Sequence, residues 1–96
     1  MAKAKPSQIC IITVTGVDKV GIIASIANAM AKVNVNIVDV NQKIMEDYFV
    51  MTMAVDIAEA TLPMDKIKKK LDRIGQEMSL NIAFQDENIF KAMHRV

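Results

Sequence analysis

The feature that most constrains this chain is the order in which its hydrophobic periodicity changes. Residues 8–15 are almost all β-branched, with apolar side chains at both parities, as in a strand at the centre of a sheet. From Gly21 to about Val33 the period is helical, residues 35–57 read as a hairpin, and a second helical stripe follows Pro63 as far as Met78. Residues 80–85 alternate again. The predicted order is strand, helix, strand, strand, helix, strand.

The hairpin pattern predicts its own register if Glu46 and Asp47 form the turn. Three pairs then share the core face, and three pairs of mixed character share the other face. A Glu-Asp turn lacks the usual glycine, so a four-residue loop of the same parity stays open. The core pairs are Ile44 with Phe49, Val40 with Met53 and Val38 with Val55, and the others are Lys43 with Val50, Asn41 with Thr52 and Asp39 with Ala54.

The ends of the helices carry their own signals. Asp18 precedes the first helix and is a candidate N-cap, and Asn34 is a candidate left-handed stop after it. Asp86 is positioned to cap a final short helix whose Ile89, Phe90 and Met93 form a small apolar face.

This order predicts an α+β chain with the ferredoxin-like βαββαβ arrangement, a four-stranded antiparallel sheet with two helices on one face, plus a C-terminal helix. Residues 1–7 are a polar N-terminal tail, 8–85 the folded domain and 86–96 the C-terminal helical extension. The first and third strands are central. Because helices cover one face only, we expect apolar residues of the other face to meet the C-terminal helix, a partner chain or a ligand, and we predict a homodimer.

Composition excludes several classes of function. The 96 residues suit one domain, and a hydrophobic fraction of 52% is incompatible with general disorder. The formal net charge of +1 gives no field that would attract nucleic acid or a membrane surface. No apolar run approaches the roughly 18 residues of a membrane span, and residues 1–7 have no apolar h-region, so we expect neither a membrane span nor a secretory leader. We therefore expect a cytoplasmic protein that binds neither nucleic acid nor membrane.

The reactive side chains do not form a catalytic or metal-binding pattern. Cys10 lies in the predicted central strand and His94 in the last turn, with no third group for a nucleophile–base arrangement. Asp18 and Asp39 have no accompanying His or Cys, so no metal site is expected. The Gly16–Gly21 loop lacks the Lys and Ser or Thr of a phosphate-binding loop. We predict no enzyme activity and no cofactor.

The loop before the first helix is the best candidate for a binding site. A helix start offers unpaired N–H groups for a carboxylate, Asp18 can accept hydrogen bonds from an ammonium group, and Gly21 permits close approach. Together these groups suit an α-amino acid. The alternative is that Asp18 only caps the helix and Gly21 only eases the turn.

The segment from Val14 to Ile23, followed by the helix and then Asn34-Val35-Asn36-Ile37, resembles the ACT domain over residues 8–85. The extension from Asp86 resembles small stand-alone ACT proteins and the regulators of glycine cleavage. The resemblance implies a ferredoxin-like dimer that binds amino acids or related small ligands at a subunit interface. Many members have proline where this chain has Val20. The implied ligand contacts are Asp18, Gly21, Ile22 and Ile23 from the first loop and helix, and Asn36, Ile37 and Asp39 from the second strand.

These observations predict a non-catalytic regulatory module that binds an amino acid as a homodimer and acts on a separate partner, either an enzyme or a regulator. The competing interpretation is a structural or protein–protein interaction module whose ligand site is vestigial.

Overall fold

The computed structural model describes residues 6–93, and it confirms the predicted ferredoxin-like architecture. Residues 1–5 of the predicted tail, and residues 94–96 of the extension with His94, lie outside the described part. The four strands form one antiparallel sheet in the order β2-β3-β1-β4, with β1 and β3 central as predicted. The elements are β1 (Ile9–Val17), α1 (Ile22–Lys32), β2 (Asn36–Met45), β3 (Tyr48–Asp56), α2 (Met64–Met78), β4 (Leu80–Asp86) and α3 (Glu87–Met93).

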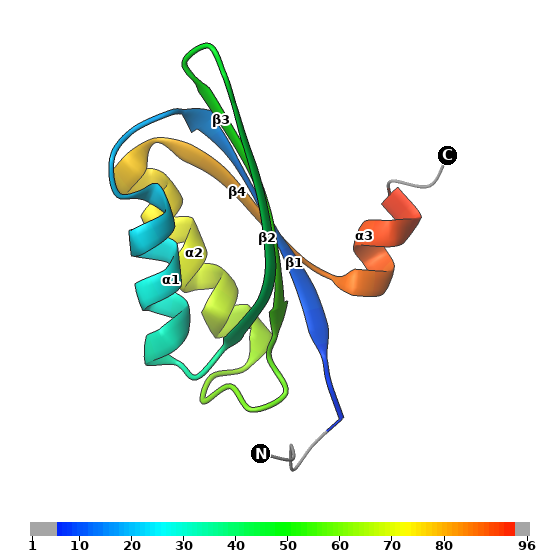
Figure 1. Cartoon of the computed structure of the whole chain (residues 1–96). Coiled ribbons are helices and arrows are strands. Elements are labelled where there is room, and N and C mark those ends of the chain that lie inside the picture. The colour runs from blue at the N-terminus through cyan, green and yellow to red at the C-terminus, as the bar shows by residue number, and fades with distance from the viewer. Residues whose placement is uncertain (1–5, 94–96) are drawn as a thin grey trace.

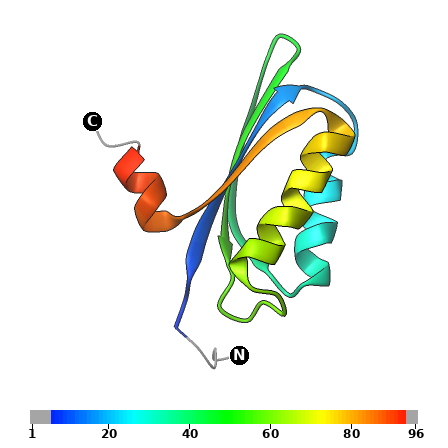
Figure 2. The same cartoon turned by 180° about the vertical axis from the view of Figure 1, so that it is seen from behind.

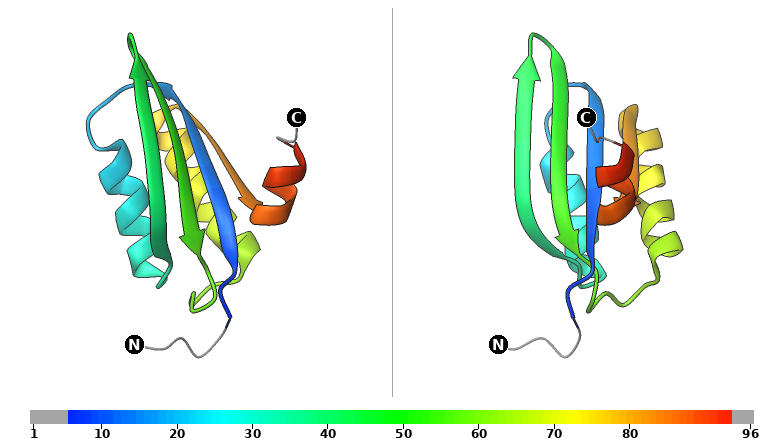
Figure 3. Two further views of the ribbon diagram at one scale, coloured as in Figure 1. Left: turned by 45° about the vertical axis from the view of Figure 1, so that its right-hand side comes forward. Right: turned by 90° about the vertical axis from the view of Figure 1, so that its right-hand side faces the viewer.

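Helices lie on both sides of the sheet, but unequally. α1 and α2 cover one face, and α3 lies alone on the other (Figures 1 and 2). Seen onto that second face, α3 lies in front of β1 and β4, whereas β2 and β3 have no helix before them (Figure 3). The contacts of α3 are accordingly with β1 and β4. We call the face that carries α3 the open face.

The core lies between the sheet and the pair α1 and α2. Alternate residues of the two central strands are buried there, as the two-sided pattern of β1 requires on its inner face. The predicted helical stripes supply the other half of the core. The contributing residues include Cys10, Ile12 and Val14 of β1, Met51, Met53 and Val55 of β3, Ile22, Ile26 and Met30 of α1, and Ile67 and Leu71 of α2.

The hairpin has the predicted two-residue turn, and the register is as predicted except at one end. Glu46 takes a positive φ of 58°, which allows Met45 to pair with Tyr48 without a glycine. The pairing of Val38 with Val55 is wrong. A β-bulge between Ile37 and Asp39 leaves Val38 out of the ladder, and Ile37 pairs with Val55. Bulges are common at sheet edges, where one extra residue bends the strand without disturbing the core.

β2 differs from the other strands because its inner face is poorly covered. Val40 and Ile44 share the face of the buried Met53 and Phe49 by register, yet both are exposed. β2 is an edge strand with a neighbour on one side only. An exposed apolar edge of this kind favours association with another chain.

The close approach of α2 to β4 gives a prediction on stability. A Cβ added to Gly75 would lie 2.9 Å from the backbone oxygen of Leu80, so Gly75→Ala must push the helix from the strand. Alanine normally stabilises a helix interior by about 1 kcal/mol over glycine. Here we expect a loss of about 1–2 kcal/mol in the free energy of unfolding, measured by urea denaturation. Gln76→Ala, at the exposed next position, should stay within about 0.5 kcal/mol. A Gly75→Ala variant more stable than the parent protein would contradict this packing.

Candidate ligand-binding site

The loop between β1 and α1 is tied to two distant parts of the chain. The Asp18 N–H donates a hydrogen bond of 2.7 Å to the Asp47 carbonyl in the hairpin turn. The Lys19 Nζ donates to the Met78 carbonyl at the end of α2. The loop is therefore attached to the rest of the fold on both sides, although most of its residues are exposed.

The prediction that Asp18 caps α1 is wrong. The N-cap is Gly21, in a left-handed conformation with φ 91° and ψ 4°, and no side chain caps the helix. β1 extends to Val17, further than predicted, and the Asp18 backbone is held at the hairpin turn, so its carboxylate does not reach the helix amides. Within residues 6–93 that carboxylate has no hydrogen-bond or ion-pair partner.

The start of α1 offers unpaired donors. The first helical bond runs from the Ser25 N–H to the Gly21 carbonyl at 2.9 Å, so the N–H groups of Ile22, Ile23 and Ala24 precede it. With no side-chain cap, these amides and the positive end of the helix dipole are left for solvent or an anionic group.

A hollow of about 260 Å³ lies between this helix start and the hairpin, and we call it the loop pocket. It brings together Asp18, Gly21, Ile22 and Ile23, four of the seven predicted contact residues. Its other lining residues were not predicted. Gln42 is a polar residue at the core-face parity of the hairpin, and this mismatch is the signal that would have identified it. The added residues are Lys19, Ala24, Gln42, Ile44 and Phe49.

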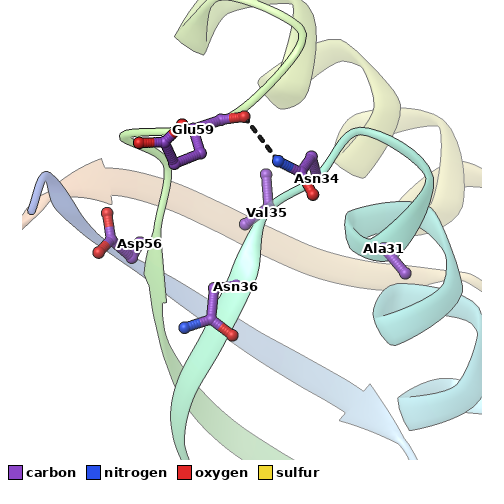
Figure 4. A pocket seen from close by; sticks show the side chains of 6 residues that line it. All are labelled: Ala31, Asn34, Val35, Asn36, Asp56 and Glu59. Carbon is purple, nitrogen blue, oxygen red and sulfur yellow. Dashed lines mark hydrogen bonds between the residues drawn. The ribbon is translucent and has the colours of Figure 1, made fainter. Parts of the chain in front are cut away.

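The three predicted contacts from β2 lie elsewhere in the same chain. Asn36 lines a second hollow of about 400 Å³ beside the end of α1, where the Asn34 Nδ2 donates to the Glu59 carbonyl at 2.9 Å (Figure 4). The 11 residues of α1 span about 16 Å, which separates this hollow from the loop pocket. Ile37 faces the core opposite Val55. By register Asp39 lies on the open face, where its Oδ1 accepts from the Val40 N–H at 2.9 Å.

The second hollow also borders a buried carboxylate, one oxygen of which accepts two hydrogen bonds from the backbone. Asp56 is 3% exposed, and its Oδ1 accepts from the N–H groups of Gln8 and Ala58, each at 3.0 Å. These bonds fix the end of β3 against the start of β1 and the following turn. We therefore regard Asp56 as a structural residue of this hollow.

The single cysteine is not available as a nucleophile. Cys10 is fully buried in β1, as predicted. Burial, together with the negative charge of Asp86, raises the pKa of the Cys10 thiol to about 11. Among residues 6–93 no three His, Cys, Asp or Glu side chains are grouped so as to hold a metal ion. Within the same residues no helix has the length and apolar character needed to cross a membrane.

The raised pKa of Cys10 predicts how stability depends on pH. Because the folded-state pKa lies above the ordinary value of 9.0, folding holds the proton more tightly than the unfolded chain does. The contribution of the protonated thiol to the free energy of unfolding is therefore fully present below about pH 9. The free energy of unfolding then falls by roughly 2–3 kcal/mol as the pH rises to about 11. Urea denaturation at several pH values measures this fall. Cys10→Ala keeps every other titrating group, so an equal fall in that variant would contradict the assignment to the thiol.

The loop pocket belongs to a small ferredoxin-like domain, and comparison with known families identifies the class of that domain. Residues 8–85 match the family model described as the ACT domain. The chain belongs to the ACT domain family. The resemblance seen in the loop and helix residues is thereby confirmed, as is the regulatory, small-molecule-binding class of module that this family represents.

Individual relatives place the chain more closely. It is 45% identical over 86 residues to a UPF0237 protein of Clostridium acetobutylicum, covering 90% of this chain and 97% of the relative. An ACT domain protein from Streptococcus pneumoniae superposes with a TM-score of 0.75 at 30% identity, covering 93% and 100% of the two chains. A protein assigned as a glycine cleavage system transcriptional repressor gives a TM-score of 0.75 at 20% identity, covering 85% and 47%. At that identity the last likeness shows the fold alone.

Proposed function

We propose that this protein is a non-catalytic regulatory module that binds an α-amino acid in the loop pocket and acts, as a cytoplasmic homodimer, on a separate enzyme or regulator. The observation that carries the proposal is the pairing of two unsatisfied groups at one hollow. The Asp18 carboxylate has no partner among residues 6–93, and the N–H groups at the start of α1 are uncapped. Asp18 takes the ammonium group, and the Ile22 and Ile23 amides take the carboxylate.

The apolar rim of the loop pocket supports the homodimer. Val20 is 99% exposed and Ile44 is 53% exposed, and Ile23 and Val40 are also exposed along the same α1–β2 side. Covering such side chains removes apolar surface from water. The open face also exposes the apolar side chains of Val17, Met45 and Tyr48, but these lie at one end of it, and its centre carries small or polar residues such as Thr13, Thr52 and Ala83. We therefore place the dimer contact at the β2 edge and not on the open face.

Antiparallel pairing of β2 with its copy would reunite the predicted site. Two β2 strands paired antiparallel run in opposite directions, so the residue at the start of one strand, Asn36, lies toward the end, Met45, of the other. The partner's Asn36 then lies at the end of β2 that borders the loop pocket. The residues that one chain separates by the length of α1 would thus come together from two chains, which is the arrangement expected of a site at a subunit interface.

A thermal-shift screen of the standard amino acids, each added separately, tests the proposal. A ligand at 100 times its dissociation constant adds about 2.7 kcal/mol of stability, which moves Tm by roughly 10 °C or more in a domain of this size. We expect one or a few amino acids to give such a shift. The same compounds without the ammonium group should give none. No shift from any amino acid would contradict the proposal.

A second candidate function rests on α3. None of its residues is buried, and its Ile89 and Met93 are exposed on the open face. In this interpretation the helix docks on another protein and the loop pocket is vestigial. The double variant Ile89→Ser and Met93→Ser would then abolish co-purification of a partner that unmodified protein retains, while no amino acid shifts Tm.

A further inference from the structure

Lys19 is a lining residue of the loop pocket, but its ammonium group is bound to a residue that does not line the pocket. The Lys19 Nζ donates to the carbonyl of Met78, the last residue of α2. The helix ends there because Ser79 adopts a left-handed conformation, with φ 56°, and its N–H bonds to the Gly75 carbonyl. The last carbonyls of a helix lack intrahelical donors and carry partial negative charge, so an ammonium group is favoured at this position.

The neighbouring residues of the loop are held just as specifically. Asp18 is bound through its N–H to the Asp47 carbonyl, so the residues on which ligand contact depends lie beside two tethers. Gly16 packs directly beneath the start of β4, where an added Cβ would lie 2.7 Å from the Leu80 Cδ2. Val20, at 99% exposure, is the part of the loop without such contacts.

We propose that Lys19 is a positioning residue of the ligand site, which holds the loop of Asp18 and Gly21 in its binding conformation by anchoring it to the end of α2. This inference rests on the proposed function. Lys19 lies between Asp18 and Gly21 in the sequence, so its bond to Met78 restricts the motion of both residues. A loop that is already ordered loses less conformational entropy when the ligand binds. The apparent dissociation constant is the intrinsic one divided by the fraction of molecules in the competent conformation, so loss of the tether weakens binding without removing a ligand contact.

The tether also connects the ligand site to the junction of α2 and β4. A ligand that binds only the ordered loop must stabilise the bond from Lys19 to Met78, and this bond must in turn favour the ligand. Ligand binding should therefore slow hydrogen exchange at the amides of Ser79 and Leu80, which lie outside the pocket. Without the lysine this protection should disappear, even where ligand is saturating.

The test compares Lys19→Met, Lys19→Arg and the control Lys32→Met, an exposed lysine in the last turn of α1. The probe is the amino acid with the largest thermal shift, together with the amine that lacks its carboxylate. We expect Lys19→Met to raise the dissociation constant of the amino acid by about three- to tenfold, the net value of one hydrogen bond. The dissociation constant for Lys19→Arg, which can still donate to the Met78 carbonyl, should stay within about twofold of that of the unmodified protein. The same is expected for Lys32→Met. Faster exchange of the amides of residues 18–22 in free Lys19→Met would accompany this loss.

Two outcomes would overturn the inference. One is that Lys19→Met leaves both affinity and loop exchange unchanged. The other is that both Lys19 variants lose affinity equally for the amino acid and not for the amine, because Lys19 would then contact the ligand carboxylate directly. If no amino acid binds the unmodified protein, the proposed function fails, whereas hydrogen exchange of the free Lys19→Met protein still decides whether the lysine orders the loop.

Discussion

Ile44→Asp is expected to convert the proposed homodimer into monomers. Ile44 lies on the edge strand β2, on the face of α1 and α2, and is 53% exposed in the single chain. Each buried isoleucine side chain contributes about 1.5–3 kcal/mol, and the two-fold axis applies the loss twice. The dimer dissociation constant should therefore rise by more than about 100-fold, as measured by sedimentation equilibrium.

The adjacent residue provides a matched control. Met45 is 57% exposed, close to the value of Ile44, but it pairs with Tyr48 and so faces the other side of the sheet. Met45→Asp should leave the dimer intact if the contact is at the β2 edge on the helix side. The reverse pattern, in which only Met45→Asp dissociates the dimer, would place the interface on the open face. A monomeric unmodified protein would exclude the homodimer altogether.

Asp18→Asn is expected to weaken amino-acid binding by about 10- to 100-fold. A hydrogen bond to a charged group contributes about 1.5–3 kcal/mol, and the amide keeps the shape of the carboxylate without its charge. The carboxylate has no partner among residues 6–93, so the free energy of unfolding without ligand should change by less than about 0.5 kcal/mol. Isothermal titration calorimetry with the amino acid identified by thermal shift measures the first quantity, and urea denaturation the second.

Asp47→Asn is the control for this variant. Asp47 is an exposed carboxylate that contacts the loop only through its backbone carbonyl, which the substitution leaves in place. The affinity of the Asp47→Asn variant for the amino acid should match that of the unmodified protein. Unchanged affinity in Asp18→Asn would show that the ammonium group is bound elsewhere and would remove Asp18 from the site.

The architecture could be predicted because each element carries its own local pattern. The helical stripes of α1 and α2 and the alternation in β3 and β4 are set by which side chains must be buried, and burial repeats with the period of the backbone. The left-handed Asn34 was also predictable, since its φ of 61° follows from a local preference. The bulge at Val38 was not, because an inserted residue on an edge strand leaves the apolar pattern almost unchanged.

The candidate site was only half predictable. Asp18, Gly21, Ile22 and Ile23 are neighbours in the sequence, and the structure brings them together at the loop pocket. Gln42 enters that pocket from β2, which is separated in the sequence from the loop by the whole of α1, and Asn36 is placed at the opposite end of α1. Distances between elements depend on packing, and no local pattern encodes them.

The sequence by itself determined the elements and their order and singled out the loop before α1 as the candidate site, because hydrophobic period and loop composition act over a few residues. The tertiary structure decided that Asp18 is bound to the hairpin turn and not to its own helix, and that Lys19 reaches the end of α2. It also decided that the inner face of β2 stays exposed. These three features depend on the relative positions of whole helices and strands, and those positions are set by the packing of side chains that are distant in the sequence.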